Sequence, residues 1–176
     1  MRIPTKKIAL TNSQIVQLVE GLNVISKGRQ VTVDGKNVER GYALTADLRY
    51  ALARIGILVK PLVEAFKTAN DQIFRDHDPV SEPDKDGKDQ LTIPTDRLLS
   101  YQDATAELFA QATEPIAFPL VSYEAMKVGD DKGQNPIPPN AIAALDPVLV
   151  WTQAEYDALA KQQSEPKATA AEGEGD

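Results

Sequence analysis

The sequence predicts an α+β fold that is mostly α, in which a long kinked helix is packed by two shorter helices. One or two small β-hairpins complete it. Three observations predict this fold. Apolar residues recur at alternating spacings of four and three from residue 48 to residue 73, a capping-box signal precedes a shorter amphipathic segment, and Asp-Gly dipeptides mark tight turns. The 176 residues are enough to bury one hydrophobic core.

The first part of the chain predicts a short strand, a helix and a hairpin. Residues Ile8–Leu10 fit the end of a short strand, and Thr11 with Gln14 forms a capping-box pattern. Apolar residues then follow at spacings of three and four, so a helix is predicted over 12–26. Over 31–38, β-branched residues surround Asp34-Gly35, a dipeptide that supplies the positive φ angles of a two-residue hairpin.

A long helix is predicted from Leu44 or Thr45 to Arg75. At about 1.5 Å per residue, some 30 residues give a rod of roughly 45 Å. Pro61 removes a backbone donor at its centre, and Gly56 lies just over one turn earlier, so a kink is expected there. The apolar seam keeps its phase across the proline, which indicates one bent helix. The seam consists of Leu48, Leu52, Ile55, Val59, Leu62, Phe66, Ala69 and Ile73.

Two interpretations of this seam follow. The helix over 12–26 and a third helix over about 96–112 each have the length to cover half of the rod, so internal packing explains the seam. Alternatively, a partner chain completes it. The partner-facing residues would then be Leu48, Leu52, Ile55, Val59, Leu62 and Phe66.

The second half of the chain predicts shorter elements. An acidic, proline-bearing loop contains a second turn at Asp86-Gly87, and 114–126 reads as edge strands or extended chain because it alternates and holds two prolines. Short helices are predicted from Asn140 to Leu145 and over 153–162, the latter with a capping box. These elements give a single globular domain over 1–162 and a disordered acidic tail over 163–176.

Charge is distributed unevenly along the chain. Residues 1–75 hold 12 Lys and Arg against 6 Asp and Glu, whereas residues 76–176 hold 7 against 20, so +6 and −13 give the net charge of −7. Such asymmetry is typical of a nucleic-acid surface or of a charge-complementary contact. Solvated segments explain it as well, because 76–89 and 164–176 together carry −7.

The residues favour a protein that is not an enzyme and has no cofactor. The chain has no cysteine and a single histidine, and it has neither a phosphate-binding loop nor a nucleophile-elbow motif. His77 lies among carboxylates, but an EF-hand alignment on Gly87 puts Ile93 where the final glutamate belongs, so no metal site is predicted. No signal peptide and no membrane-spanning run is recognised.

Nucleic-acid binding is the alternative that the basic residues support. Lys27, Arg29, Lys36 and Arg40 flank the predicted hairpin, and a β-ribbon with basic flanks can lie along a phosphate backbone. Only Tyr42 is nearby for base stacking, so this contact is not the favoured one.

The order of elements resembles a family of small uncharacterised proteins encoded by tailed bacteriophages. The phrases that carry the resemblance over about residues 8–150 are LTNSQIVQLVEGLNVI, YALTADLRYALARIGILVKPLVEAF, DKDGK, AELFAQATEPI and NAIAALDPVLV. The chain departs from the family in the basic insertion at 27–41 and after Trp151. No catalytic residues come with that family.

The resemblance implies a phage protein located in the virion or the host cytoplasm. We expect a non-enzymatic virion or assembly component that contacts other phage proteins or forms a homo-oligomer. The alternative is an accessory factor that binds nucleic acid or a host protein.

Overall fold

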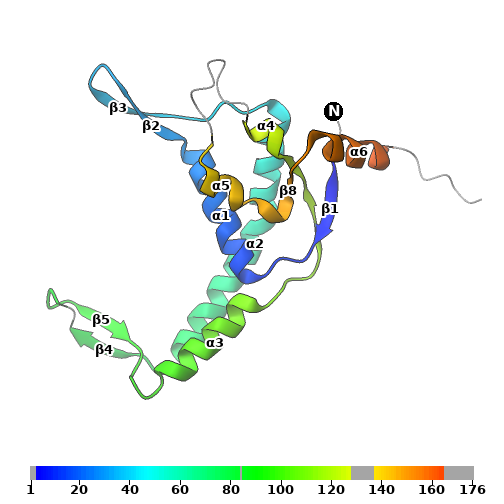
Figure 1. Cartoon of the computed structure of the whole chain (residues 1–176). Helices are drawn as coiled ribbons and strands as arrows, with labels where there is room; N and C mark the ends of the chain where they lie inside the picture. Colours follow the sequence, from blue (N-terminus) through cyan, green and yellow to red (C-terminus); the bar gives the residue numbers. More distant parts are fainter. Residues whose placement is uncertain (1–2, 84, 128–136, 165–176) are drawn as a thin grey trace, which may run out of the picture.

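The computed structural model describes residues 3–83, 85–127 and 137–164. Its elements form two parts, a head and an arm (Figure 1). The head contains α1 (Asn12–Lys27), the amino-terminal half of α2 (Ala46–Asp76) and the strands and short helices around them. The arm contains the carboxy-terminal half of α2, α3 (Leu98–Ala110) and a hairpin at its tip. Six α-helices and four two-stranded sheets in the described residues confirm the predicted, mostly helical α+β class.

Helix α1 begins with the predicted capping box. The Thr11 hydroxyl accepts a hydrogen bond from the amide of Gln14 at 3.2 Å, and the Gln14 side chain accepts one from the Thr11 amide at 2.9 Å. The helix packs against α2 and against α5 (Pro139–Ala143). A Cβ added at Gly21 would lie 2.7 Å from the Cβ of Ala144, so the glycine permits the close approach to the segment that follows α5.

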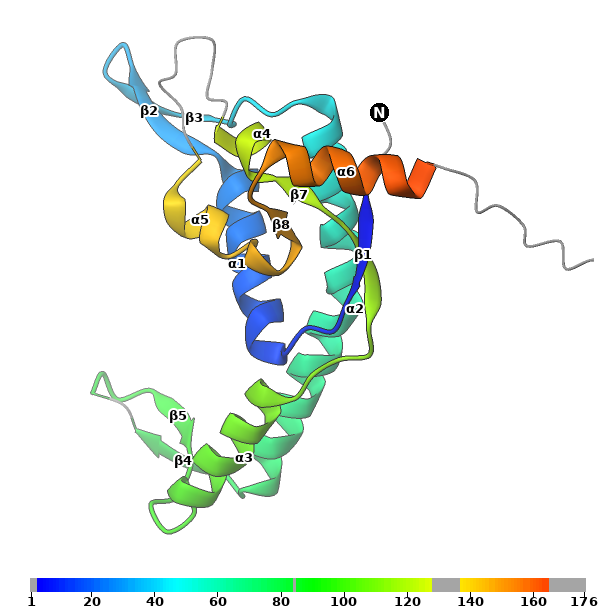
Figure 2. The same cartoon turned by 45° about the vertical axis from the view of Figure 1, so that its right-hand side comes forward.

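Helix α2 confirms the predicted long rod. It spans 31 residues, and Thr45 caps it by accepting a hydrogen bond from the amide of Leu48 at 3.3 Å. The helix continues through Pro61 without interruption, and both views show that its lower half is inclined to its upper half (Figures 1 and 2). The exposed proline therefore lies inside one continuous, curved helix.

Two small sheets complete the head. Strand β1 (Thr5–Ile8) pairs antiparallel with β6 (Ile116–Pro119), and β7 (Val121–Ser122) pairs parallel with β8 (Leu149–Val150). The strand predicted to end at Leu10 ends at Ile8, because the Leu10 amide instead donates to the Thr113 hydroxyl. The extended chain predicted over 114–126 is correct up to Ser122 and wrong beyond it, since Tyr123–Lys127 forms α4.

The remaining short elements follow the predicted order. Helix α5 is followed by a 3-10 turn at Asp146–Val148, and α6 (Gln153–Ser164) is two residues longer than predicted. The expected disordered tail lies outside the described residues from residue 165 onward, and the domain boundary at residue 162 stays a prediction.

The arm is a helical pair with a hairpin at its end. Helix α3 lies along the lower half of α2, and Phe66 of α2 meets Phe109 of α3 edge to face with ring centroids 5.0 Å apart. Strands β4 (Val80–Pro83) and β5 (Asp89–Thr92) pair antiparallel around the second Asp-Gly turn. Gly87 has a φ of 72° there, which favours glycine, so the second predicted turn is also a hairpin turn.

The hydrophobic core lies in the head. One cluster of buried side chains joins α1, the upper half of α2, the strands and the α5 region. Its fully enclosed members include Leu10, Ile15, Leu18, Ile55, Phe118, Leu145 and Val148. The hairpin formed by β2 (Arg29–Val33) and β3 (Lys36–Arg40) extends from the head beyond this core (Figure 1).

Candidate functional site

The β2–β3 hairpin brings together three of the four predicted basic residues. Its register pairs Arg29 with Arg40 and Val33 with Lys36. Since successive side chains of a strand point to opposite faces, Arg29, Lys36 and Arg40 share one face. Lys27 belongs to the last turn of α1 and lies outside the hairpin.

The same face carries three valines. Val31 pairs with Val38, and Val33 lies beside the turn, so Val31, Val33 and Val38 alternate with outward-facing polar residues. Val33 is 40% exposed and Val38 is 44% exposed. The opposite face is polar and has its own cross-strand bond, from the Thr32 hydroxyl to Asn37 Oδ1 at 3.0 Å. We call the set Arg29, Val31, Val33, Lys36, Val38 and Arg40 the basic-valine face.

Backbone geometry fixes this hairpin at both ends. Asp34 and Gly35 have φ angles of 50° and 74°, as a two-residue hairpin turn requires. At the base, Gly28 has a φ of 72°, and a Cβ added there would lie 2.3 Å from the carbonyl oxygen of Arg40. Glycine is thus required where the chain leaves α1 and passes the end of β3.

The predicted seam of α2 is covered unequally along its length. Leu48, Leu52, Ile55 and Val59 are buried in the head, where α1, β6 and β7 pack against α2. Leu62 is half-buried and packs against the core cluster of the head, and Phe66 is half-buried against Phe109 of α3 in the arm. The structure therefore does not leave the first four side chains for a partner, and internal packing explains this half of the seam.

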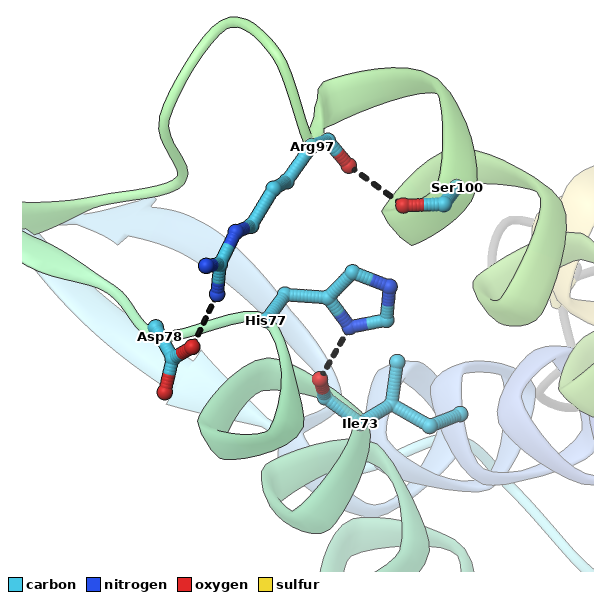
Figure 3. Close-up of polar contacts among 5 residues, drawn as sticks. All are labelled: Ile73, His77, Asp78, Arg97 and Ser100. Atoms are coloured by element: carbon cyan, nitrogen blue, oxygen red, sulfur yellow. Dashed lines mark hydrogen bonds and ion pairs between the residues drawn. The ribbon is translucent and has the colours of Figure 1, made fainter.

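His77 has a structural place at the junction of α2 and the arm tip. It is the carboxy-terminal cap of α2, and its Nδ1 lies 2.7 Å from the carbonyl oxygen of Ile73 (Figure 3). Its ring also meets Tyr101 edge to face, with ring centroids 5.5 Å apart. A carbonyl only accepts, so Nδ1 carries the proton in this bond. The helix ends at Asp76, one residue later than predicted, and His77 directly follows it as the cap.

An exposed ion pair closes the arm tip beside this histidine. The Arg97 guanidinium donates to the Asp78 carboxylate, so Arg97 joins the start of α3 to the end of α2 (Figure 3). The hydrogen bond to Asp78 and its negative charge raise the pKa of Arg97 above its ordinary value. Within the described residues, no group of three or more histidine and acidic side chains is arranged to hold a metal ion.

A half-open cavity of about 210 Å³ lies between the start of α2, the β6–β7 segment and α6. Ser122 lines it, but its hydroxyl donates to the amide oxygen of Gln153 at 2.9 Å, and an amide does not activate a nucleophile. Burial raises the pKa of the Tyr156 phenol, and the charge of Asp47 adds to the rise. These residues hold a protonated phenol and a satisfied hydroxyl, which suit packing and hydrogen bonding.

Comparison of the chain with protein-family models, with curated proteins and with solved structures gives no match. No helix among the described residues is long and apolar enough to cross a membrane.

Sequence reasoning found the basic residues but missed the valines beside them. A signal for the face was present, because Val31 and Val33 alternate with polar residues before the turn, and Lys36, Val38 and Arg40 alternate after it. Only the register shows that the two alternating rows share a face.

Proposed function

We propose that this chain is a non-enzymatic phage protein that acts through protein–protein contacts, most directly as a virion or assembly component. The observation that carries the proposal is the exposure of apolar side chains on elements that project from the core. Val33 and Val38 lie on the β2–β3 hairpin, and Val80 and Leu91 lie on the β4–β5 hairpin at 40% and 56% exposure. A two-stranded hairpin is marginally stable by itself, and a protein partner would cover both its apolar residues and its open edges.

The arm and the resemblance support the same proposal. Leu99 in the first turn of α3 is 75% exposed, and α3 belongs to the arm, which extends away from the core (Figure 1). The order of elements resembles small proteins of tailed phages, which supports other phage proteins as partners and the virion or the host cytoplasm as the location.

Mass spectrometry of purified phage particles tests the proposal. We expect the chain at a stoichiometric copy number in the particle or in an isolated assembly intermediate. A Val33→Ser/Val38→Ser variant should be incorporated less, whereas a Gln30→Ser/Thr32→Ser variant on the opposite face should be incorporated normally. Absence from particles and intermediates, despite abundant chain in infected cells, would refute the structural role.

The alternative function is nucleic-acid binding by an accessory factor, and the basic side chains on one hairpin face favour it. A phosphate contact makes binding to duplex DNA fall steeply with salt. Replacing Lys27, Arg29, Lys36 and Arg40 with Gln should then abolish retention on DNA, and should change stability by at most about 0.5 kcal/mol per site. If the wild-type chain and the four-Gln variant are retained equally on DNA at low salt, nucleic-acid binding by this face is ruled out.

A further inference from the structure

The two projecting hairpins carry opposite charge. The segment 29–40, from the start of β2 to the end of β3, has three basic and two acidic residues, giving +1. The segment 80–92, from the start of β4 to the end of β5, has four acidic and two basic residues, giving −2. The basic-valine face belongs to the basic first part of the chain, residues 1–75 at +6, and the β4–β5 hairpin belongs to the acidic remainder at −13.

The hairpins lie at the two ends of α2. Strand β3 precedes the helix and β4 follows it, and both views show the hairpins extending to the same side of α2 (Figures 1 and 2). Each hairpin is a separate two-stranded sheet, so neither joins any further strand of the described chain. Strand β3 is exposed along its whole length, as is β4.

We propose that a second copy of this chain binds antiparallel to the first, so that the β2–β3 hairpin of each copy contacts the β4–β5 hairpin of the other. The proposal rests on the proposed function and names the partner of those contacts. In this arrangement the basic-valine face contacts one face of the β4–β5 ribbon, and each face of that ribbon offers an apolar residue beside a carboxylate: Val80 with Glu82 on one, Leu91 with Asp89 on the other. Apolar residues would cover apolar residues, and cations would lie against carboxylates.

Symmetry favours the antiparallel arrangement over a single contact. The distance between the two hairpins is the same in both copies, so a two-fold rotation that forms one contact forms the second at once. Two-fold dimers are the commonest assemblies of identical chains, and their surfaces must be self-complementary. A basic element at one end and an acidic element at the other end of the same side satisfy this requirement.

Net charge also selects this contact. Two copies at −7 repel each other over most orientations, whereas the two hairpins attract, so the favoured approach is the one that pairs them. Salt screens exposed charges, with a screening length that falls from about 10 Å at 0.1 M to about 3 Å at 1 M. The association should therefore weaken as ionic strength rises. The contacts of the valines and Leu91 should determine the affinity that remains at high salt.

Sedimentation velocity of the full-length chain and two charge-reversal variants tests the proposal. Wild type should shift with concentration from the 19.2 kDa monomer to a dimer. Lys36→Glu/Arg40→Glu should stay monomeric at the same concentrations, and so should Glu82→Lys/Asp89→Lys. The four positions are exposed, and circular dichroism checks that both variants fold.

Mixing the two charge-reversal variants is the decisive experiment. An acidic β2–β3 hairpin of one variant can bind only the basic β4–β5 hairpin of the other, and the wild-type hairpins that remain pair in the second contact. The mixture should recover a dimer with one chain of each kind, while either variant alone does not. A chain that carries all four substitutions should dimerise with itself. Charge effects without specific pairing would not produce this recovery.

A control variant, Arg54→Glu/Lys60→Glu, makes the same change in net charge as Lys36→Glu/Arg40→Glu, but on the exposed surface of α2. It should dimerise like wild type. A wild-type chain that stays monomeric at every concentration would overturn the proposal, and so would variants that dimerise as well as wild type. Either outcome would overturn the hairpin pairing and leave the proposed function standing, because incorporation into particles tests that function separately. DNA binding by wild-type monomers that the Lys36→Glu/Arg40→Glu variant loses would assign the basic face to nucleic acid instead.

Discussion

Truncating Ile55 to alanine should destabilise the fold strongly, and truncating Ile57 should not. The two isoleucines lie two residues apart on α2, but Ile55 is 0% exposed and Ile57 is 64% exposed. Removing about three methylene equivalents at about 0.8 kcal/mol each costs about 2.4 kcal/mol when the side chain is fully buried. The cavity left in the head adds to this, which gives about 3–4 kcal/mol, within the range seen for buried Ile→Ala changes.

Ile57→Ala is the matched control, because it makes the same chemical change on the same helix. Its expected effect is within about 0.5 kcal/mol, since the exposed side chain loses little burial and alanine is the better helix former.

Urea unfolding followed by circular dichroism measures both free energies. For a chain of this size, the Ile55→Ala loss corresponds to a melting temperature lower by about 6–16 °C. Equal effects at the two positions would refute the assignment of the inner face of α2. A strong effect at Ile57 that depends on protein concentration would show that a second copy covers the outer face.

Three further predictions use the backbone and one titrating group. Gly28→Ala should destabilise by about 1–3 kcal/mol, because the positive φ of Gly28 and its close approach to β3 exclude a side chain. Gly56→Ala should stabilise by about 0.5–1 kcal/mol, because the space around an added Cβ is open there. Thermal melting measures both changes. Pro61→Ala should change stability little, because α1 and α3 already hold the two halves of α2, and a stabilisation approaching the ~3 kcal/mol cost of an interior proline would contradict that packing. The raised pKa of Tyr156 means that its stabilising contribution is complete below the unfolded value of about 10 and is lost as pH rises through the folded value. Tyr156→Phe should therefore flatten the loss of stability in alkaline solution, measured by unfolding across that range, and an unchanged slope would contradict it.

The elements that depend on neighbouring residues were predictable from the sequence. Thr11 with Gln14 predicted the start of α1, and Asp34 with Gly35 predicted the β2–β3 turn, because in both cases the interacting atoms lie within a few residues. Helix α2 was predicted to within about two residues at each end by its continuous seam.

Pairings between distant segments could not be predicted in this way. Nothing in Thr5–Ile8 indicates that its partner is Ile116–Pro119, since register between remote strands depends on where the helices place them. The seam shows the same limit. Periodicity tells which side of a helix faces inward, but Leu52 and Phe66 share that side and differ in how much of the chain covers them.

The candidate site was half predictable for the same reason. Basic residues near a turn are visible in the sequence, so Arg29, Lys36 and Arg40 were identified. Their common face with three valines depends on the pairing of β2 with β3, and the opposite charge of the β4–β5 hairpin has meaning only because the two hairpins lie on one side of α2. The acidic segment was interpreted from sequence as a solvated loop.

The pairing of β1 has a consequence for how the chain folds as it leaves the ribosome. Its strand partner is β6, and the amide of Thr5 also donates to the side chain of Gln163, 158 residues away in the sequence. Closing such long loops is slow, because the entropy of closure is lost before the contacts form. The edge of β1 that β6 covers therefore stays open until residues 116–119 have been synthesised, and its contact with Gln163 forms later still. The newly made chain should be most prone to aggregation in that interval, so a chaperone or a fused amino-terminal domain should raise the yield of folded protein.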